Sequence, residues 1–239
     1  MSVASHLGIK TGEYDRQILT FIPYYDEILD AAADALVALD RPARLLLDLG
    51  TGSGALAARC LKRLPGARVV GIDGDRAMLA MAEKRLGKKL TPVVGNFETT
   101  AFPRCDVVSA SFSLHHVPAP SAKARIFARA FAALRPGGIL VDADCTLASD
   151  AKLRARDHET WRRHLAVGHG PAGARKFLRA WADEDTYFPL ELETALLRKA
   201  GFDVDVVWRR SSLSVIVAVK ARRRSTGPGG RSASVRRTP

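Results

Sequence analysis

The sequence predicts an α/β domain with a doubly wound, mostly parallel sheet. Short apolar runs bounded by turn residues alternate with stretches of helical periodicity, the pattern of strands joined by right-handed helical crossovers. Hydrophobic residues make up 47% and charged residues 26% of the 239 residues, enough for a full core. This balance excludes a wholly disordered chain and a collagen-like repeat. The three cysteines lie too far apart for a disulfide framework or a CxxC metal site.

The first elements alternate between helix and strand. A helix is expected over 24–39, where apolar residues recur on one helical face. The run 44–49 is short, apolar and bounded by turn residues, as expected of a strand buried on both faces. A helix follows over 53–64 and ends at Pro65-Gly66, and a second buried strand covers 67–73.

The alternation continues to residue 145. An amphipathic helix is expected over 75–86, followed by a third strand at 90–95 and a fourth at 105–112. A helix over 121–134 leads into a Pro-Gly-Gly turn, and 139–145 forms the fifth strand.

The last third of the chain departs from this rhythm. Residues 148–188 are polar, rich in arginine and aromatic, and they are expected to form a helical cap, either as a lid over a substrate or as an added helix pair with its own core. A helix over 190–200 ends at Gly201, and 203–210 and 213–220 resemble a closing hairpin.

The net charge of +12 is concentrated at one end. Residues 221–239 hold six arginines and no acidic residue, and they account for half of the excess. This stretch is too poor in apolar residues to fold and is expected to be a disordered, Arg-rich tail, with a weak nucleic-acid contact as the alternative. No apolar run approaches the roughly 18 to 20 residues of a membrane span, and no secretory signal is evident, so a cytoplasmic protein without membrane contact is expected.

The glycine-rich turn between the first strand and its helix carries the chemical signal. Gly50, Gly52 and Gly54 allow a tight turn and the close approach of a ligand to the backbone, and the helix that follows offers N–H groups to an anion. Gly50, Gly52 and Ala55 also satisfy a dinucleotide pattern with Asp73 near the ribose. Asp48 argues against that alternative, since an acidic residue beside the turn would repel a pyrophosphate.

The segment 46–54, LLDLGTGSG, resembles the hhDhGxGxG motif of the class I S-adenosylmethionine (SAM)-dependent methyltransferases. The stretches 105–117, 133–144 and 199–220 also resemble later motifs of that family, in the same order. The resemblance implies a seven-stranded Rossmann-like sheet with an antiparallel last strand, helices on both faces, and SAM as cofactor. It implies an enzyme that methylates an O, N or C atom of a small molecule.

The resemblance also implies which residues bind the cofactor. Asp73 is expected to bind the ribose hydroxyls, and Asn96 stands where the family usually has an acidic residue toward adenine. The full expected set is Tyr25, Asp48, Gly50, Thr51, Gly52, Gly54, Asp73, Gly74, Asn96, Phe97 and Ser111.

His115 and His116 follow the fourth strand, near the expected methyl group, and are the candidate catalytic residues. Either one could instead cap a turn or point to solvent. Asp142 and Asp144 end the fifth strand on alternate faces, and no metal site is expected from them. His158, His164 and His169 are expected to be solvated, because their spacing does not stack them on one helical face.

The Pro23-x-Tyr25 segment resembles a cofactor-covering element found in small-molecule and tRNA-modification branches of the family, including the carboxy-SAM synthases. Carboxy-SAM synthesis is therefore an alternative function, and it would need an arginine such as Arg179 to pair with the added carboxylate. A tRNA-modifying methyltransferase and a non-catalytic SAM-binding regulatory module are further alternatives.

The expected organisation has three parts: a helical segment over the cofactor site at 1–41, the SAM-binding domain at 42–220 with the cap at 148–188, and the tail at 221–239. A small-molecule substrate is the expected partner, with a homodimer as an open possibility.

Overall fold

The computed structural model describes residues 9–222. The first eight residues and most of the Arg-rich tail, 223–239, lie outside this range, so the expectations of disorder and of a nucleic-acid contact there stay predictions. None of the helices in the described range is both long and apolar enough to cross a membrane.

Within residues 9–222, seven strands form one sheet in the order β3-β2-β1-β4-β5-β7-β6. Strands β1 to β5 pair in parallel, and β7 runs antiparallel to both of its neighbours, which confirms the predicted topology. The strands are β1 (Leu45–Leu49), β2 (Arg68–Asp73), β3 (Leu90–Val94), β4 (Cys105–Ser111), β5 (Leu134–Cys145), β6 (Asp203–Arg210) and β7 (Leu213–Val219).

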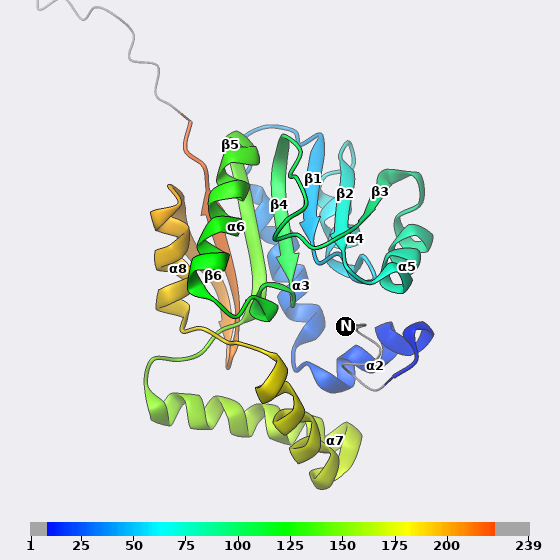
Figure 1. Cartoon of the computed structure of the whole chain (residues 1–239), viewed down its shortest axis with the longest axis vertical. Coiled ribbons are helices and arrows are strands. Elements are labelled where there is room, and N and C mark those ends of the chain that lie inside the picture. The colour runs from blue at the N-terminus through cyan, green and yellow to red at the C-terminus, as the bar shows by residue number, and fades with distance from the viewer. Residues whose placement is uncertain (1–8, 223–239) are drawn as a thin grey trace, which may run out of the picture.

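Helices cover both faces of the sheet, because successive strand residues point to opposite sides. Leu46 and Val107 pack into one core cluster with α3 (Tyr25–Asp34), α4 (Ala55–Arg63) and α5 (Arg76–Leu86). Their neighbours Leu47 and Val108 pack into a second cluster with α6 (Pro120–Ala133) and α8 (Leu190–Lys199). Figure 1 shows α6 and α8 in front of the sheet and α3 behind it.

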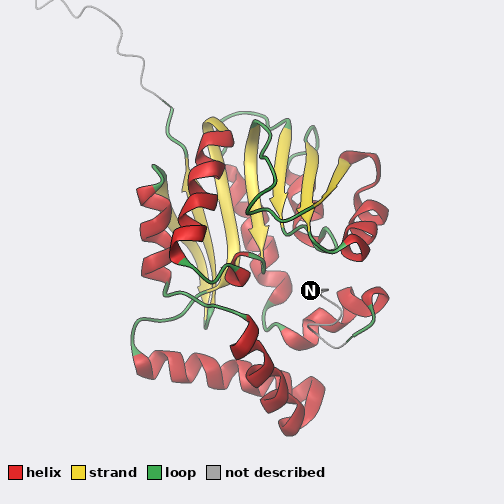
Figure 2. Cartoon of the chain, viewed as in Figure 1, coloured by secondary structure: helices red, strands yellow, loops and turns green. Residues whose placement is uncertain are grey.

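Two predicted boundaries were wrong. The helix expected over 24–39 ends at Asp34 and continues as a 3₁₀ turn at Ala35–Ala38. The Pro-Gly-Gly segment at 136–138, predicted as a turn before the fifth strand, lies within β5, because Leu134 already pairs with Cys105 before the register shifts. No helix lies between β3 and β4, and Figure 2 shows this connection as a loop.

The expected cap at 148–188 contains one long helical element, α7 (Ala151–Glu184). It breaks at Gly170, which has φ 67°, directly before Pro171, so the chain folds back as two helices. Together with α2 (Tyr14–Phe21), α7 lies below the carboxyl ends of the strands in Figure 1.

Two histidines expected to be solvated pack instead against α2. His164 Nε2 lies 3.0 Å from the carbonyl oxygen of Leu19, and His169 stacks on Phe21 with ring centroids 4.6 Å apart. The helical spacing of these residues gave no sign of this, because the contact depends on α7 folding back over α2.

Candidate active site

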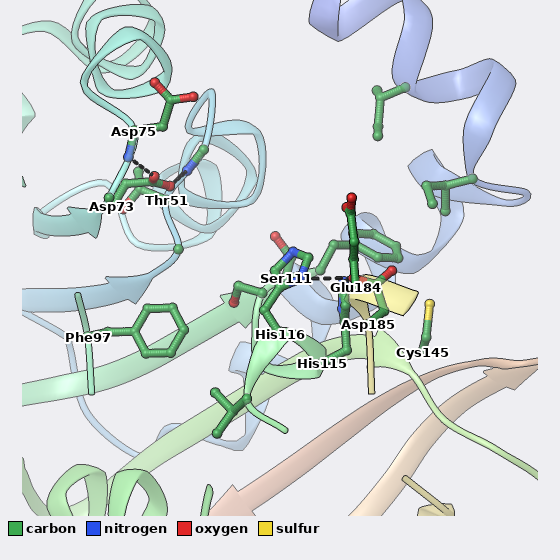
Figure 3. A pocket seen from close by; sticks show the side chains of 18 of the residues that line it. Thr51, Asp73, Asp75, Phe97, Ser111, His115, His116, Cys145, Glu184 and Asp185 are labelled. Carbon is green, nitrogen blue, oxygen red and sulfur yellow. Dashed lines mark hydrogen bonds and ion pairs between the residues drawn. The ribbon is translucent and has the colours of Figure 1, made fainter. Parts of the chain in front are cut away.

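A cavity of about 640 Å³ lies at the carboxyl ends of the parallel strands. Its wall includes the loop after β1, the ends of β2, β4 and β5, residues of α2 and α3, and the carboxyl end of α7. Ligands of doubly wound sheets bind at this edge, where the strand order reverses between β1 and β4. Figure 3 shows the side chains that converge there.

The glycine-rich loop crosses this edge in a conformation that requires glycine. Gly50 and Gly52 have φ values of 67° and 54°, in the left-handed region. A Cβ atom on Gly50 would lie 2.3 Å from the Cβ atom of Ser113, so this position has no room for a side chain. The backbone N–H groups of Gly50 and Thr51 both donate to the carbonyl oxygen of Ile72, which fixes the loop to the end of β2.

Asp73 connects the same loop to the cavity. Its carboxylate accepts hydrogen bonds from the N–H groups of Gly52 at 2.7 Å and of Asp75 at 2.8 Å, as Figure 3 shows. Burial raises the pKa of Asp73, and the two N–H donors oppose that shift. The carboxylate is therefore held beside the loop, and Asp73 and Gly74 both line the cavity.

Two of the expected cofactor residues do not line the cavity. Asp48 is 2% exposed and accepts a hydrogen bond of 2.5 Å from Ser109 Oγ on the neighbouring strand, and burial raises its pKa to about 7. Gly54 faces α5, where a Cβ atom would lie 3.2 Å from the side chains of Ala82 and Leu86. Asp48 therefore points from β1 toward the neighbouring strand β4, and Gly54, the residue before α4, packs against α5.

The remaining expected cofactor residues are brought together around the cavity. The residues Tyr25, Gly50, Thr51, Gly52, Asp73, Gly74, Asn96, Phe97 and Ser111 all belong to its wall. Asn96 Oδ1 accepts from the N–H of Glu98 at 2.8 Å, which orients the amide. Tyr25 stacks on Phe112, with ring centroids 5.6 Å apart. Phe112 itself has φ 47°, and such unusual backbone conformations for a bulky residue cluster at functional sites.

His115 belongs to a chain of buried hydrogen bonds at the opposite end of the cavity. Its Nδ1 lies 2.6 Å from Asp144 Oδ1, and the other Asp144 oxygen accepts from the N–H groups of Leu114 and His115. Its Nε2 faces Asp185 Oδ1 at 3.8 Å. His116 Nδ1 lies 3.0 Å from the same Asp185 oxygen. The N–H of Thr186 donates to the carbonyl oxygen of His115, which holds Asp185 beside both rings.

These contacts shift the pKa values of His115 and Asp144. Burial alone would lower the pKa of His115, but the carboxylates of Asp144 and Asp185 raise it above the ordinary value. Burial alone would raise the pKa of Asp144, but His115 and the backbone lower it to about 2. Asp144 is therefore an ionised partner that holds the imidazole in one orientation.

Asp142, the other acid that ends β5, lies outside the cavity wall, where burial raises its pKa well above the ordinary value. Among the described residues, His115, His116 and Asp185 form a group whose potential ligand atoms lie within 4.8 Å of one another, so these side chains could hold a metal ion. The 3.0 Å between His116 and Asp185 is equally that of an imidazole–carboxylate hydrogen bond, whereas the 3.8 Å between His115 and Asp185 is longer than one.

Sequence reasoning missed part of the wall. Tyr14, Ile18 and Ile22 come from the amino-terminal helices, and Cys145 ends β5. The first half of α7 adds Trp161, and the carboxyl end of α7 and the segment after it add Trp181, Asp183, Glu184, Asp185 and Tyr187. The aromatic residues were recognised as a lid or as a separate core. In the structure they pack on one another and on α2, because Trp161 contacts Trp181 and donates its Nε1–H to the carbonyl oxygen of Phe21. Trp161, Trp181 and Tyr187 also line the cavity, and their role as a lid stays a prediction.

Comparison with known proteins agrees with this geometry. A family model described as a methyltransferase domain matches residues 46–138. The chain is 36% identical to a trans-aconitate 2-methyltransferase of Acidovorax sp. (strain JS42) over 112 residues, which are 46% of this chain and 42% of that protein. It is 23% identical to a carboxy-S-adenosyl-L-methionine synthase of Shewanella baltica (strain OS155) over 150 residues, 60% of this chain and 61% of that protein.

Among solved structures, human N-acetylserotonin methyltransferase in complex with SAM matches with a TM-score of 0.59 and 19% identity, covering 89% of this chain and 57% of that one. This likeness concerns the fold. The chain spans less than half the length of the trans-aconitate 2-methyltransferases it matches. The motifs, the sheet order and the matched family model agree with one another, and residues 46–138 match the methyltransferase domain that this model describes.

Proposed function

We propose that the protein transfers the methyl group of SAM to a small molecule bound under α2 and α7. The observation that carries this proposal is one continuous cavity with two chemically different ends. The glycine-rich loop and Asp73 lie at one end, and His115 and the aromatic residues of α7 lie at the other.

The residues at the loop end suit SAM. The first turn of α4 presents backbone N–H groups to the carboxylate of the methionine part. Asp73 can accept hydrogen bonds from the ribose hydroxyls, and Asn96 and Phe97 can contact the adenine from the end of β3. When bound, SAM supplies an electrophilic methyl group on a positively charged sulfur. The two ends of the cavity hold the acceptor close to that group and aligned with it, which accounts for much of the rate of such a displacement.

His115 is the candidate general base for an acceptor that must lose a proton. With Nδ1–H donated to Asp144, the neutral imidazole carries its lone pair on Nε2. His115 itself lines the cavity, and this nitrogen can accept the proton that the acceptor atom releases as it bonds to the methyl carbon. The aromatic side chains of Trp161, Trp181 and Tyr187 line this end of the cavity.

Carboxy-SAM synthesis is less well supported by the site. The arginine suggested for that function, Arg179, is an exposed residue of α7 outside the cavity wall. The described wall contains neither lysine nor arginine, so it offers no strong partner for an added carboxylate. A non-catalytic SAM-binding module is disfavoured by the buried His115–Asp144 pair, which a regulatory site does not require.

A cytoplasmic location is part of the same proposal. Cys60, Cys105 and Cys145 are buried and unpaired, which suits a reducing compartment.

The proposal is tested by identifying the small molecule that co-purifies with the full chain and by titrating S-adenosylhomocysteine (SAH) into the stripped protein. Mass spectrometry should detect SAM or SAH, and calorimetry should show one SAH site per chain. Co-purified carboxy-SAM would favour the alternative synthase, and NAD would overturn both functions.

A further inference from the structure

The cavity wall is acidic, although the chain as a whole is basic. The whole sequence carries a net charge of +12. Six acidic residues nevertheless line the cavity, while its described wall includes neither lysine nor arginine. Three of the acids, Asp73, Asp75 and Glu98, lie at the cofactor end. The other three, Asp183, Glu184 and Asp185, are consecutive and lie at the acceptor end.

The run Asp183–Asp185 lies at the C-terminus of α7, where acidic side chains are unfavourable. It begins in the last turn of α7, and that turn contains no basic residue. Carbonyl groups at a helix C-terminus carry partial negative charge, so acidic side chains there are unfavourable and cations are favoured. Three acids at this end therefore lower the stability of the helix and form a place suited to positive charge.

Asp185 is the innermost carboxylate of the run. Its side chain is 3% exposed, and it lies beside His115 and His116, as Figure 3 shows. Burial alone would raise its pKa, but the hydrogen bond with His116 and the charge of His115 lower it below the ordinary value. The acceptor end thus keeps an ionised carboxylate at neutral pH. Asp183 also borders the outer surface formed by Arg175, Lys176 and Arg179, but these exposed cations lie outside the cavity and are screened by solvent.

Aromatic rings complete the acceptor end. Trp161 and Trp181 lie with ring centroids 5.8 Å apart, and Tyr187 lies 6.1 Å from Trp161 and 5.4 Å from the ring of His115. Aromatic faces bind flat molecules, and they attract cations through their quadrupoles. The acidic and the aromatic side chains at this end therefore both favour a positively charged ligand.

We propose that the acceptor is a planar aromatic molecule that carries a basic aliphatic amino group and binds as its cation, and that the site rejects anionic acceptors such as polycarboxylates. Where this nitrogen is the methylated atom, it first gives its proton to the neutral Nε2 of His115, because a protonated nitrogen has no lone pair with which to bond to the methyl carbon. This inference rests on the proposed function and names the substrate class of the same site. It separates this protein from the relatives whose names specify trans-aconitate, since the described wall has neither lysine nor arginine to pair with a carboxylate, and the ring of His115 already faces Asp144 and Asp185.

The test uses three probes with one ring system: 2-naphthylmethylamine, 2-naphthol and 2-naphthoate. Each is titrated calorimetrically into the full chain saturated with SAH. We expect the amine to bind at least about tenfold more tightly than the carboxylate, and trans-aconitate to show no binding at about 1 mM. Raising the salt concentration should reduce the preference for the amine, because part of the attraction is electrostatic.

A double variant, Asp183→Asn with Glu184→Gln, removes two negative charges from the acidic run and keeps the size of both side chains. It should reduce the amine-to-carboxylate preference at least about threefold while leaving SAH affinity unchanged. A matched control, Asp203→Asn with Asp205→Asn, removes the same charge from exposed positions of β6 and should leave the preference unchanged.

The outcomes separate this inference from the proposed function. Failure of SAH to bind would contradict the function itself. SAH binding combined with equal affinity for 2-naphthoate and the amine, with no amine binding at about 1 mM, or with tight binding of trans-aconitate would overturn the substrate class alone. A preference that the double variant leaves unchanged would also overturn it.

Discussion

Substitution of Asp73 by asparagine tests the cofactor end of the site. The carboxylate accepts hydrogen bonds from the N–H groups of Gly52 and Asp75, and each oxygen keeps a lone pair for one ribose hydroxyl. Asparagine preserves the shape of the side chain, removes the charge and leaves one accepting oxygen. The variant therefore loses one hydrogen bond to the ribose and the charge assistance of the other.

The expected loss can be estimated from these contacts. A hydrogen bond to a charged group contributes about 1.5–3 kcal/mol, so the affinity for SAM should fall by about tenfold to 150-fold. SAH should lose about as much, since it shares the ribose. The free energy of unfolding should fall by about 1–3 kcal/mol, because one of the two N–H donors loses its acceptor. Calorimetric titration measures the affinities, and urea denaturation measures the stability.

Asp106→Asn is the matched control. Asp106 is a buried carboxylate that also accepts two backbone N–H bonds, from Arg44 at 2.8 Å and Leu45 at 3.0 Å, but at the amino end of β4. Its substitution should destabilise the fold and leave SAM affinity unchanged. If Asp73→Asn binds SAM as the wild type does, or weakens SAM but not SAH, the ribose assignment is wrong.

Three further predictions concern the loop, the buried ion pair and the tail. Gly50→Ala should fail to fold at 37 °C, because the added Cβ atom has no room. Gly52→Ala has room for the Cβ atom but keeps a left-handed φ, so it should fold with a stability loss of about 1–2 kcal/mol and lose SAH binding. Thermal unfolding measures the stability of the two variants, and calorimetry measures their SAH binding. The pKa of His115 is raised by Asp144, so the stabilisation that the pair provides should be full below about pH 6.5 and decline as the pH rises through the raised value. Asp144→Asn should therefore cost more free energy of unfolding at about pH 5.5 than at about pH 9, and an equal cost at both would refute the ionised pair. Deletion of 223–239 should leave the thermal midpoint and SAH affinity unchanged and remove any salt-dependent tRNA binding; tRNA binding that persists would assign it to the domain.

The sheet could be predicted from the sequence because its signals are local. Each parallel strand is a short apolar run between turn residues, and the glycine-rich loop identified which strand comes first. The seven-stranded sheet with an antiparallel last strand followed from the family resemblance. A helix pair was one expectation for the cap, but the position of the break in α7 was not predicted, although Gly170-Pro171 is a strong local signal, because the surrounding residues have no clear helical periodicity.

In the candidate site too, contacts between neighbouring segments could be predicted, and contacts between distant segments could not. Gly50, Gly52 and Asp73 could be placed because the chain brings them together over a few residues of loop and one adjacent strand. Asp185 and Tyr187 could not, since they reach His115 only through the fold of a segment some seventy residues later in the chain. A motif does not indicate which of its members face a cavity, and Asp48 and Gly54, both expected to bind the cofactor, lie outside the cavity wall.

The two ends of the cavity come largely from different stretches of the chain. The residues 46–138, which match the methyltransferase family model, carry the loop, Asp73 and the two histidines, whereas the aromatic and acidic wall of the other end comes largely from 14–25 and 145–187. If the proposed function holds, substitutions in these flanking stretches change which acceptor binds and leave the loop and Asp73 as they are. Two proteins that are nearly identical over 46–138 could then bind different acceptors. Percentage identity over the matched segment therefore describes the cofactor end of the cavity, and the flanking stretches have to be compared separately to judge the acceptor end.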